Sequence, residues 1–325
     1  MNSGRNFLDR FNQYFKKIDK ELNRTFSSHI PLIEDIGRHS LLGEGKRLRP
    51  LLFVLSSRLC GYKGEDIFYL STMFEYIHNA SLLHDDVIDN AEIRRKKPSA
   101  SRIWGNSAAV LTGDYLSSKA VTIALGTNNM ELLLFATDTG IRMTEGQFLE
   151  LEHTDDWNTS KEEYMEIITS KTAELISATC ACGAIIAGAE KEVTDNLKNF
   201  GLNLGIAFQL VDDLLDYASS EEELGKPVGK DLREGKITLP LIYTLPKMEK
   251  EEVERFEDIF TSHRAEDEDY LELIRSVRNN GAIEKIRSDA KDYVNKAAGF
   301  LNIFPESSLK EALIALNEYI ADRNF

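Results

Sequence analysis

The sequence is short of cysteine and of basic charge, and each shortage excludes a class of protein. Its three cysteines, Cys60, Cys180 and Cys182, are too few for a disulfide framework, and no neighbouring ligands make the last two a zinc pair. Lys and Arg number 39 against 54 Asp and Glu, a net charge of −15 that disfavours nucleic acid as the main partner. Reduced cysteines fit an intracellular setting.

Long apolar segments are also missing. Residues 1–17 are charged and lack the apolar core of a signal peptide. The longest weakly polar run, 176–189, is shorter than the roughly 20 residues that a membrane-spanning helix needs. We therefore expect a cytoplasmic protein without a membrane span. The hydrophobic content of 42% is nevertheless sufficient for a buried core.

Apolar residues recur at intervals of three and four along almost the whole chain, and strand-like alternation is nearly absent. The spacing predicts helices over 65–90, 107–126, 129–152, 161–188, 195–219 and 237–247, and charged amphipathic helices over 250–262, 267–279, 281–302 and 306–323. No repeat, low-complexity linker or shift in composition divides the chain. We expect one all-α domain over 1–325, built as a single large helical bundle.

Two acidic motifs interrupt apolar helices. They are LHDDVID, with Asp85, Asp86 and Asp89, and QLVDDLLD, with Asp212, Asp213 and Asp216. The first and last aspartates of each motif are four residues apart, about 5–6 Å on one helix face, where like charges destabilise the helix. Carboxylates are also costly in apolar surroundings. A divalent cation resolves both conflicts, and oxygen ligands with open positions favour Mg²⁺, which also binds phosphates.

Three turn regions are rich in cations, although the protein is acidic overall. They are LGEGKRLRP at 42–50, RRKKP at 94–98 and GKPVGKDLREGK at 225–236. A single such loop, or a single acidic motif, is also typical of a solvated surface. Two motifs together with three basic loops instead predict a site where facing triplets hold a diphosphate through bridging metal ions. Arg and Lys would neutralise the remaining phosphate charge.

These motifs resemble those of the isoprenyl diphosphate synthase family, and among them the all-trans polyprenyl diphosphate synthases. The resemblance covers almost the whole chain in the family's order: GKRLRP at 45–50, EYIHNASLLHDDVID at 75–89, RR at 94–95, KTAEL at 171–175, FQLVDDLLD at 208–216 and GKPVGKDLREGKITLP at 225–240. It implies the isoprenoid synthase type of helical bundle, with a central substrate tunnel. The family is usually homodimeric, and the apolar helices near 107–152 are candidates for the interface.

The resemblance also implies the reaction. In this family an allylic diphosphate ionises at a site of three Mg²⁺ ions, the double bond of isopentenyl diphosphate attacks the cation, and a proton is lost. This is head-to-tail prenyl transfer. The main metal ligands implied are Asp85, Asp89 and Asp212. The other aspartates, which would support them or ligate through water, are Asp86, Asp213 and Asp216.

The substrate-binding residues follow from the same resemblance. Those implied for the allylic diphosphate are Arg94, Lys171, Thr172, Gln209, Lys226 and Lys236, and Lys171 is also counted as catalytic. Those implied for isopentenyl diphosphate are Lys46, Arg49, His78 and Arg95. His78 lies seven residues before Asp85, on nearly the same helix face. Arg47 either joins this group or faces water. For Lys230 and Arg233 we favour surface pairs with Asp231 and Glu234 over phosphate contact.

Product length depends on the helix that ends in Asp85. Ser81 and Ala80 lie roughly 6 and 7.5 Å below the metal site, where short-chain relatives carry bulky aromatics, so a farnesyl stop is disfavoured. Ile77 and Phe74 follow, roughly 12 and 16 Å down, and Phe74 is either a deeper floor or a core residue. We expect a medium-to-long, octaprenyl-like product for quinone side chains. The alternative is a geranylgeranyl or farnesyl diphosphate synthase.

Two other classes of protein are alternatives to a polyprenyl synthase. A terpene cyclase usually replaces the second aspartate motif and needs no isopentenyl site, whereas here that motif is intact and Lys46, Arg49 and Arg95 are present. A non-catalytic regulatory subunit of a heteromeric prenyl synthase typically lacks aspartates from one triplet, and none is missing here. An activity assay of the chain alone distinguishes a regulatory subunit from a catalytic one.

Overall fold

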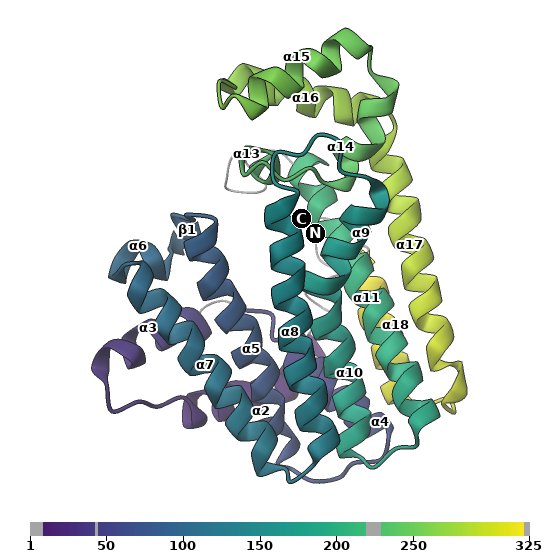
Figure 1. Ribbon diagram of the computed structural model, residues 1–325. Helices are drawn as coiled ribbons and strands as arrows, with labels where there is room; N and C mark the ends of the chain where they lie inside the picture. The colour runs from purple at the N-terminus through teal and green to yellow at the C-terminus, as the bar shows by residue number, and fades with distance from the viewer. Residues whose placement is uncertain (1–8, 43–44, 219–228, 322–325) are drawn as a thin grey trace. The chain divides into compact units, whose positions relative to one another are not determined.

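A computed structural model describes residues 9–42, 45–218 and 229–321 (Figure 1). Regular structure in these ranges is almost entirely helical. The one exception found there is a short antiparallel hairpin of β1 (Ile93–Arg94) and β2 (Lys97–Pro98). The all-α prediction is confirmed. No helix in the described ranges is long and apolar enough to cross a membrane.

The chain divides into two compact units, each made of separate segments. The first unit comprises Met1–Gly140, Leu175–Gly201 and Ile303–Leu313, and the second comprises Ile141–Glu174, Leu202–Asn302 and Ile314–Phe325. Because the segments alternate along the sequence, no single cut in the chain separates one unit from the other. The single domain expected over 1–325 stays a prediction.

The first unit is organised around α5 (Ile67–Ile88), which packs most extensively against three other helices. These neighbours are α7 (Asn106–Gly126), α4 (Leu48–Leu59) and α2 (Asn12–Thr25). Figure 1 shows α5 and α7 side by side. The remaining helices of this unit are α3 (Pro31–Leu41), α6 (Ala100–Trp104), most of α10 (Glu174–Ile186) and the first parts of α8 (Met130–Glu152) and α11 (Lys191–Ala218). Most of α5 is buried, and besides its apolar residues it carries polar ones such as Glu75, His78 and Asn79 before its acidic final turn.

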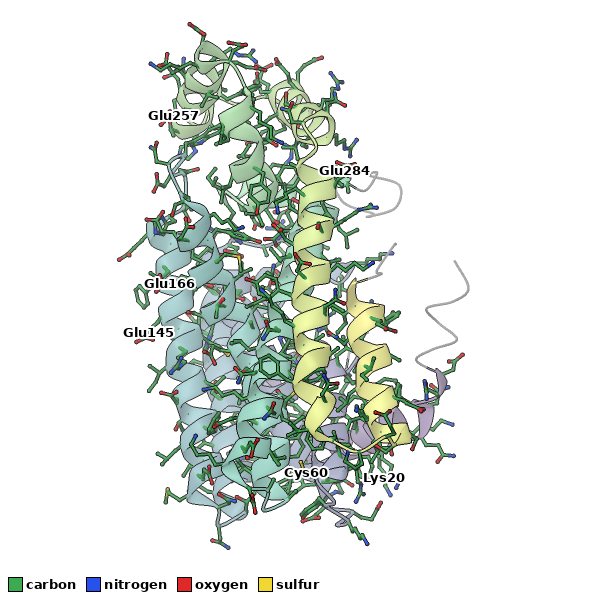
Figure 2. The ribbon with its side chains drawn as sticks, turned by 90° about the vertical axis from the view of Figure 1, so that its right-hand side faces the viewer. Lys20, Cys60, Glu145, Glu166, Glu257 and Glu284 are labelled. Carbon is green, nitrogen blue, oxygen red and sulfur yellow. The ribbon has the colours of Figure 1, made fainter. Side chains whose placement is uncertain are left out.

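The second unit contains the later parts of α8 and α11 and most helices of the C-terminal half. Those helices are α9 (Lys161–Ile168), α13 (Lys230–Arg233), α14 (Leu239–Thr244), α15 (Lys250–Thr261), α16 (Asp267–Asn279), α17 (Ala282–Phe300) and the end of α18 (Ser308–Ala321). Short 3₁₀ turns follow two of them, at Leu245–Lys247 and Leu301–Ile303. Exposed acidic side chains such as Glu145, Glu166 and Glu284 point to solvent from α8, α9 and α17 (Figure 2).

Each range that the spacing predicts is matched closely by an observed helix, with one informative difference, whereas α2, α3, α4, α6 and α13 had no predicted range. The spacing predicts an unbroken helix over 161–188, whereas the structure has α9, a π-helical turn at Thr169–Ala173 and then α10. A reciprocal cap between Ser160 and Glu163 starts α9. Such π-turns are rare and often mark functional sites. This one contains Lys171 and Thr172, two of the residues predicted to bind substrate.

Candidate active site

The first aspartate triplet lies where α5 ends. Asp85 is in the last turn and Asp89 terminates the helix, with its backbone N–H donating to the Asp85 carbonyl at 2.8 Å. Both side chains are half-buried, and their spacing places them on one face of the helix end. The C-terminal end of a helix carries partial negative charge, so two carboxylates there increase the need for a cation.

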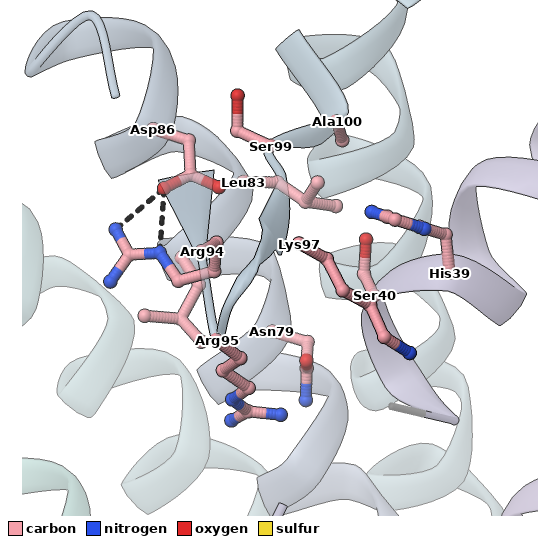
Figure 3. A pocket seen from close by; sticks show the side chains of 11 residues that line it. His39, Ser40, Asn79, Leu83, Asp86, Arg94, Arg95, Lys97, Ser99 and Ala100 are labelled. Atoms are coloured by element: carbon pink, nitrogen blue, oxygen red, sulfur yellow. Dashed lines mark hydrogen bonds and ion pairs between the residues drawn. The ribbon is translucent and has the colours of Figure 1, made fainter. Parts of the chain in front are cut away.

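Asp86 points in a different direction from its neighbours. Its side chain is buried, and Oδ1 accepts a hydrogen bond of 2.7 Å from Arg94 Nε. The same oxygen forms an ion pair with Arg94 Nη2 at 2.5 Å (Figure 3). Arg94 belongs to β1, so the short hairpin is tied to the end of α5. A residue predicted to ligate metal and a residue predicted to bind diphosphate are therefore engaged with each other in this structure.

A cation cluster formed by Arg49 and Arg95 lies beside the imidazole of His78, which belongs to α5. Arg49 Nε and Arg95 Nη1 are buried, and neither has a hydrogen-bond partner within the described ranges. Burial lowers the pKa of Arg49 to about 10, although Glu75 partly opposes the shift. Burial and the nearby arginines hold the pKa of His78 well below 6.5, so this side chain is neutral. Buried donors without partners fit an anionic ligand.

Arg47 does not face water, one of the two positions left open by the sequence, and its membership of the isopentenyl diphosphate group stays a prediction. It is buried, and its guanidinium donates to Glu75 at 2.8 Å, to Asp19 at 3.0 Å and to the Leu41 carbonyl at 2.6 Å. Its neighbour Lys46 is exposed. Arg47 is thus an internal anchor of the loop that precedes α4.

The second triplet lies near the end of α11, in the second unit. Asp213 is buried, and its two oxygens accept hydrogen bonds from Tyr164 at 2.6 Å and from Gln209 at 2.7 Å. Burial raises the pKa of Asp213 to about 7, although these two donors lower it. Asp212 is exposed, and Asp216 Oδ2 accepts a hydrogen bond of 2.9 Å from the backbone N–H of Asp231. Gln209, predicted to bind substrate, here holds an aspartate.

Two lysines that are far apart in the sequence meet at one carboxylate. The ammonium of Lys171 contacts Glu150, and Lys236 lies 4.0 Å from the same Glu150 oxygen and 2.8 Å from Glu234. The structure therefore brings together two cations that the resemblance assigns to the same diphosphate. Lys226 lies outside the described residues.

The sequence reasoning missed Glu150, and one signal for it was present. A Cβ at Gly146 would lie 2.5 Å from the backbone nitrogen of Lys171. A glycine is therefore needed for α8 to approach the π-turn this closely. Because Glu150 is one turn after Gly146 on the same helix, it lies beside Lys171.

The basic segment after the second triplet is held largely by salt bridges. Lys230 pairs with Glu234 at 2.6 Å, as expected. Arg233 does not pair with Asp231 or Glu234, which corrects the expectation. It pairs with Asp267 at 2.8 Å and lies 4.1 Å from the ring centre of Tyr270, because α16 packs against this segment. Asp231, expected at the surface, has a pKa well above its usual range because of burial and because of Asp216 and Asp213.

The four residues proposed to set product length differ in exposure. Phe74 is fully buried and packs on Phe53 of α4, with ring centres 5.2 Å apart, and Ala80 is also buried. Ile77 and Ser81 are half-buried, and the Ser81 hydroxyl donates to the His78 carbonyl at 2.9 Å. Core packing is thus the observed role of Phe74, and its influence on product length stays a prediction.

Comparison with known proteins decides the class. Residues 30–277 match a family model described as polyprenyl synthetase, which is more than half of the chain. The chain belongs to this family. It is therefore a trans-prenyltransferase, and the structure has the family's isoprenoid synthase fold.

Individual relatives agree with this assignment. The octaprenyl diphosphate synthase of Haemophilus influenzae is 35% identical over 95% of this chain and 94% of its own. The geranylgeranyl diphosphate synthase of Sulfolobus acidocaldarius is 38% identical over 75% of this chain and 78% of its own. A polyprenyl synthase from Caulobacter crescentus, crystallised with calcium and isoprenyl diphosphate, superimposes with a TM-score of 0.93 at 35% identity, covering 99% of this chain and 98% of its own. The relatives differ in product, so membership of the family does not fix chain length.

Proposed function

We propose that this polyprenyl synthetase condenses isopentenyl diphosphate with an allylic diphosphate, using Mg²⁺, to make an octaprenyl-like all-trans product for quinone side chains. The observation that carries the proposal is the pairing of two acidic helix ends with two sets of cations. One set contains buried guanidinium nitrogens without partners within the described ranges, and the other contains lysines gathered at a carboxylate. Diphosphate is an anion that both sets fit.

The cations beside α5 would bind isopentenyl diphosphate. Arg49 Nε and Arg95 Nη1 would each gain the hydrogen-bond acceptor that the described residues do not provide. Lys46, which is exposed and lies just before α4, would add a third cation. His78 is neutral, so it donates one hydrogen bond without adding repulsion among the arginines.

The cations of the second unit would bind the allylic diphosphate. Lys171 and Lys236 are held at Glu150 and Glu234, carboxylates that occupy the ammonium groups until a phosphate replaces them. Thr172 adjoins Lys171 in the π-turn. The remaining residues proposed for this substrate are Arg94, Gln209 and Lys226.

The aspartates fit a divalent cation of the Mg²⁺ type. No cluster of three or more acidic, histidine or cysteine side chains that could hold a metal exists within the described ranges. A pair of carboxylates from one helix face leaves other positions open for water and diphosphate oxygens, as Mg²⁺ prefers. The proposed direct ligands are Asp85, Asp89 and Asp212. The buried aspartates Asp86, Asp213 and Asp216 would support them or ligate through water. Three bound ions, as the resemblance implies, would neutralise the leaving diphosphate.

The residues of the chain then bind and orient the substrates and exclude water. The apolar surface of α5 keeps water from the carbocation, which water would quench. No side-chain base is required, because the departing diphosphate accepts the proton. Ala80 and Ser81 are small and so leave room for the growing chain, which favours a long product over a farnesyl one. In the geranylgeranyl alternative, Phe74 would close the end of the product tunnel. Its packing on Phe53 instead favours a role in the core.

A second copy of the chain is proposed to cover an apolar face. In the first unit the exposed side chains include Leu111, Leu125, Met130 and Leu134, and in the second unit they include Ile141, Phe148 and Leu151. On α8, Leu134, Ile141 and Phe148 recur every seven residues and are 60% or more exposed. Such a stripe is costly in water and typical of an interface between helices.

Product analysis tests the proposed function. The purified chain alone is incubated with Mg²⁺, labelled isopentenyl diphosphate and farnesyl diphosphate, and the products are separated by length. We expect a ladder that extends well beyond geranylgeranyl diphosphate. A clean geranylgeranyl stop would favour the alternative, to be checked with Phe74→Ala. Absence of any incorporation would contradict the proposal and favour a regulatory subunit.

A further inference from the structure

A buried carboxylate lies under the cation cluster of the first unit. Glu75, ten residues before Asp85 on α5, is only 3% exposed. Its Oε1 accepts a hydrogen bond of 2.8 Å from Arg47 Nη1 and one of 3.3 Å from Asn79 Nδ2. Asn79 also donates to the Glu75 backbone carbonyl at 2.8 Å, which fixes the carboxylate within its own helical turn. A carboxylate is rarely buried this deeply unless it is paired.

Glu75 acts on more than one guanidinium. It attracts Arg47, Arg49 and Arg95 electrostatically, while the last two repel each other. His78 contributes no charge because its pKa is low. Glu75 is therefore a buried counter-ion common to all three guanidinium groups, and it reduces their mutual repulsion.

Glu75 is also one of three groups that hold Arg47, which caps the start of α4. Arg47 has left-handed backbone geometry, with φ of +48°, and its side chain reaches Asp19 of α2, the Leu41 carbonyl of α3 and Glu75. A Cβ at Gly45 would lie 2.7 Å from Arg47 Nη1 and 3.0 Å from Arg95 Nη1, so the loop backbone rests directly on both guanidinium groups. Residues 46 and 49, which flank Arg47, can keep their positions only while Arg47 keeps its own.

We propose that Glu75 is a positioning residue for isopentenyl diphosphate: it holds Arg47, and through it residues 45–49 at the start of α4, in the geometry that places Lys46 and Arg49 for the diphosphate. The proposal rests on the function assigned above to the cation cluster. Glu75 contacts no substrate in this account. Its negative charge alone would weaken anion binding, so the proposal requires that orientation of the loop outweighs that repulsion.

Direct binding tests this balance. Isopentenyl diphosphate cannot react without an allylic partner, so its dissociation constant can be measured by calorimetry on the intact chain. For Glu75→Gln we expect binding weaker by about tenfold or more, the effect of losing one charge-assisted hydrogen bond. The matched control is Asp19→Asn, which removes the charge from the other, half-exposed partner of Arg47 and should change binding by less than about twofold. Unchanged or tighter binding by Glu75→Gln would overturn the proposal.

Steady-state kinetics distinguish positioning from a general structural role. Glu75→Gln should raise KM for isopentenyl diphosphate about tenfold while kcat and KM for the allylic substrate stay within about twofold. A general loss of packing would change all three parameters and would overturn the proposal. A wild-type chain without elongation activity would instead contradict the proposed function, so the two failures are distinguishable.

A second variant covers the case in which Glu75→Gln does not fold. Arg47→Lys keeps the positive charge but loses the forked geometry that joins three elements. It should raise the same KM selectively. In the double variant, KM for isopentenyl diphosphate should rise no more than in the more affected single variant, because both substitutions break the same Arg47–Glu75 contact. Additive effects would show that Glu75 and Arg47 act separately, contrary to the proposal.

Discussion

The two aspartate triplets have the same spacing but lie in different electrostatic surroundings. At the end of α5, Asp86 is paired with the guanidinium of Arg94, and further arginines lie close by. On α11, Asp213 is held by the neutral donors Tyr164 and Gln209, and its pKa is raised to about 7. The inner aspartate of the first triplet is supported by a permanent charge, whereas that of the second is supported by the neutral donors Tyr164 and Gln209.

This difference shows that one motif can be stabilised in two ways. An arginine compensates a buried carboxylate whether or not substrate is present. A tyrosine and an amide compensate it less strongly, and burial then favours its protonated form. We therefore expect the two sites to respond differently to substitution, pH and metal removal.

The largest effect should come from the proposed metal ligands themselves. Asp85→Ala and Asp212→Ala should each lower kcat by about a thousandfold or more, because the charge on the leaving diphosphate is then less well neutralised. Far-UV circular dichroism should show an unchanged helical fold. Asp35→Ala, at an exposed position on α3, is the matched control. Activity near the wild-type rate in either variant would contradict the assignment.

Removing the support of each inner aspartate should affect stability unequally. Arg94→Ala removes the charged partner of the buried Asp86 and should lower the free energy of unfolding by about 2–3 kcal/mol. Tyr164→Phe removes one neutral donor and should cost about 1 kcal/mol. Urea denaturation measures both. Equal losses would remove the distinction between the two triplets, and Asp86→Asn should recover part of the loss in Arg94→Ala.

The smallest effect should be a dependence of stability on pH caused by His78. Its pKa in the folded protein lies well below 6.5, so below pH 6.5 the unfolded chain binds more protons. Stability is therefore full above pH 6.5 and is lost as pH falls below it, by at most about 1.4 kcal/mol per pH unit. Denaturation from pH 7 to pH 5 should show a shallower loss for His78→Gln than for the wild type. His29→Gln, at an exposed position, should match the wild type, and a shallower loss there would contradict the account.

Local patterns in the sequence predict much of this structure. The intervals between apolar residues predict α5, α7 and α8 to within a few residues, because periodicity is a local property. The four-residue spacing places Asp85 with Asp89 on one face for the same reason. The acidic motifs and basic loops, together with their resemblance to a family, also identify the class of enzyme that the comparisons confirm.

Contacts between distant segments are what local patterns miss. Arg47 pairs with Glu75, 28 residues away, and its direction depends on how α2, α3 and α5 pack. Glu150 meets Lys171 because Gly146 allows two helices to approach closely. The π-turn has the apolar spacing of an ordinary helix, so periodicity alone could not distinguish it. Such features arise from tertiary packing, which overrides local preference.

The most direct test of the account compares metal dependence at the two substrate sites. Calorimetry would measure binding of isopentenyl diphosphate and of a non-ionisable allylic diphosphate analogue, first in EDTA and then with Mg²⁺. We expect the dissociation constant of isopentenyl diphosphate to differ by less than about twofold between the two conditions, because arginines hold this substrate. The dissociation constant of the analogue should be at least about a hundredfold higher in EDTA than with Mg²⁺. Loss of isopentenyl diphosphate binding in EDTA, or metal-independent binding of the analogue, would contradict the account.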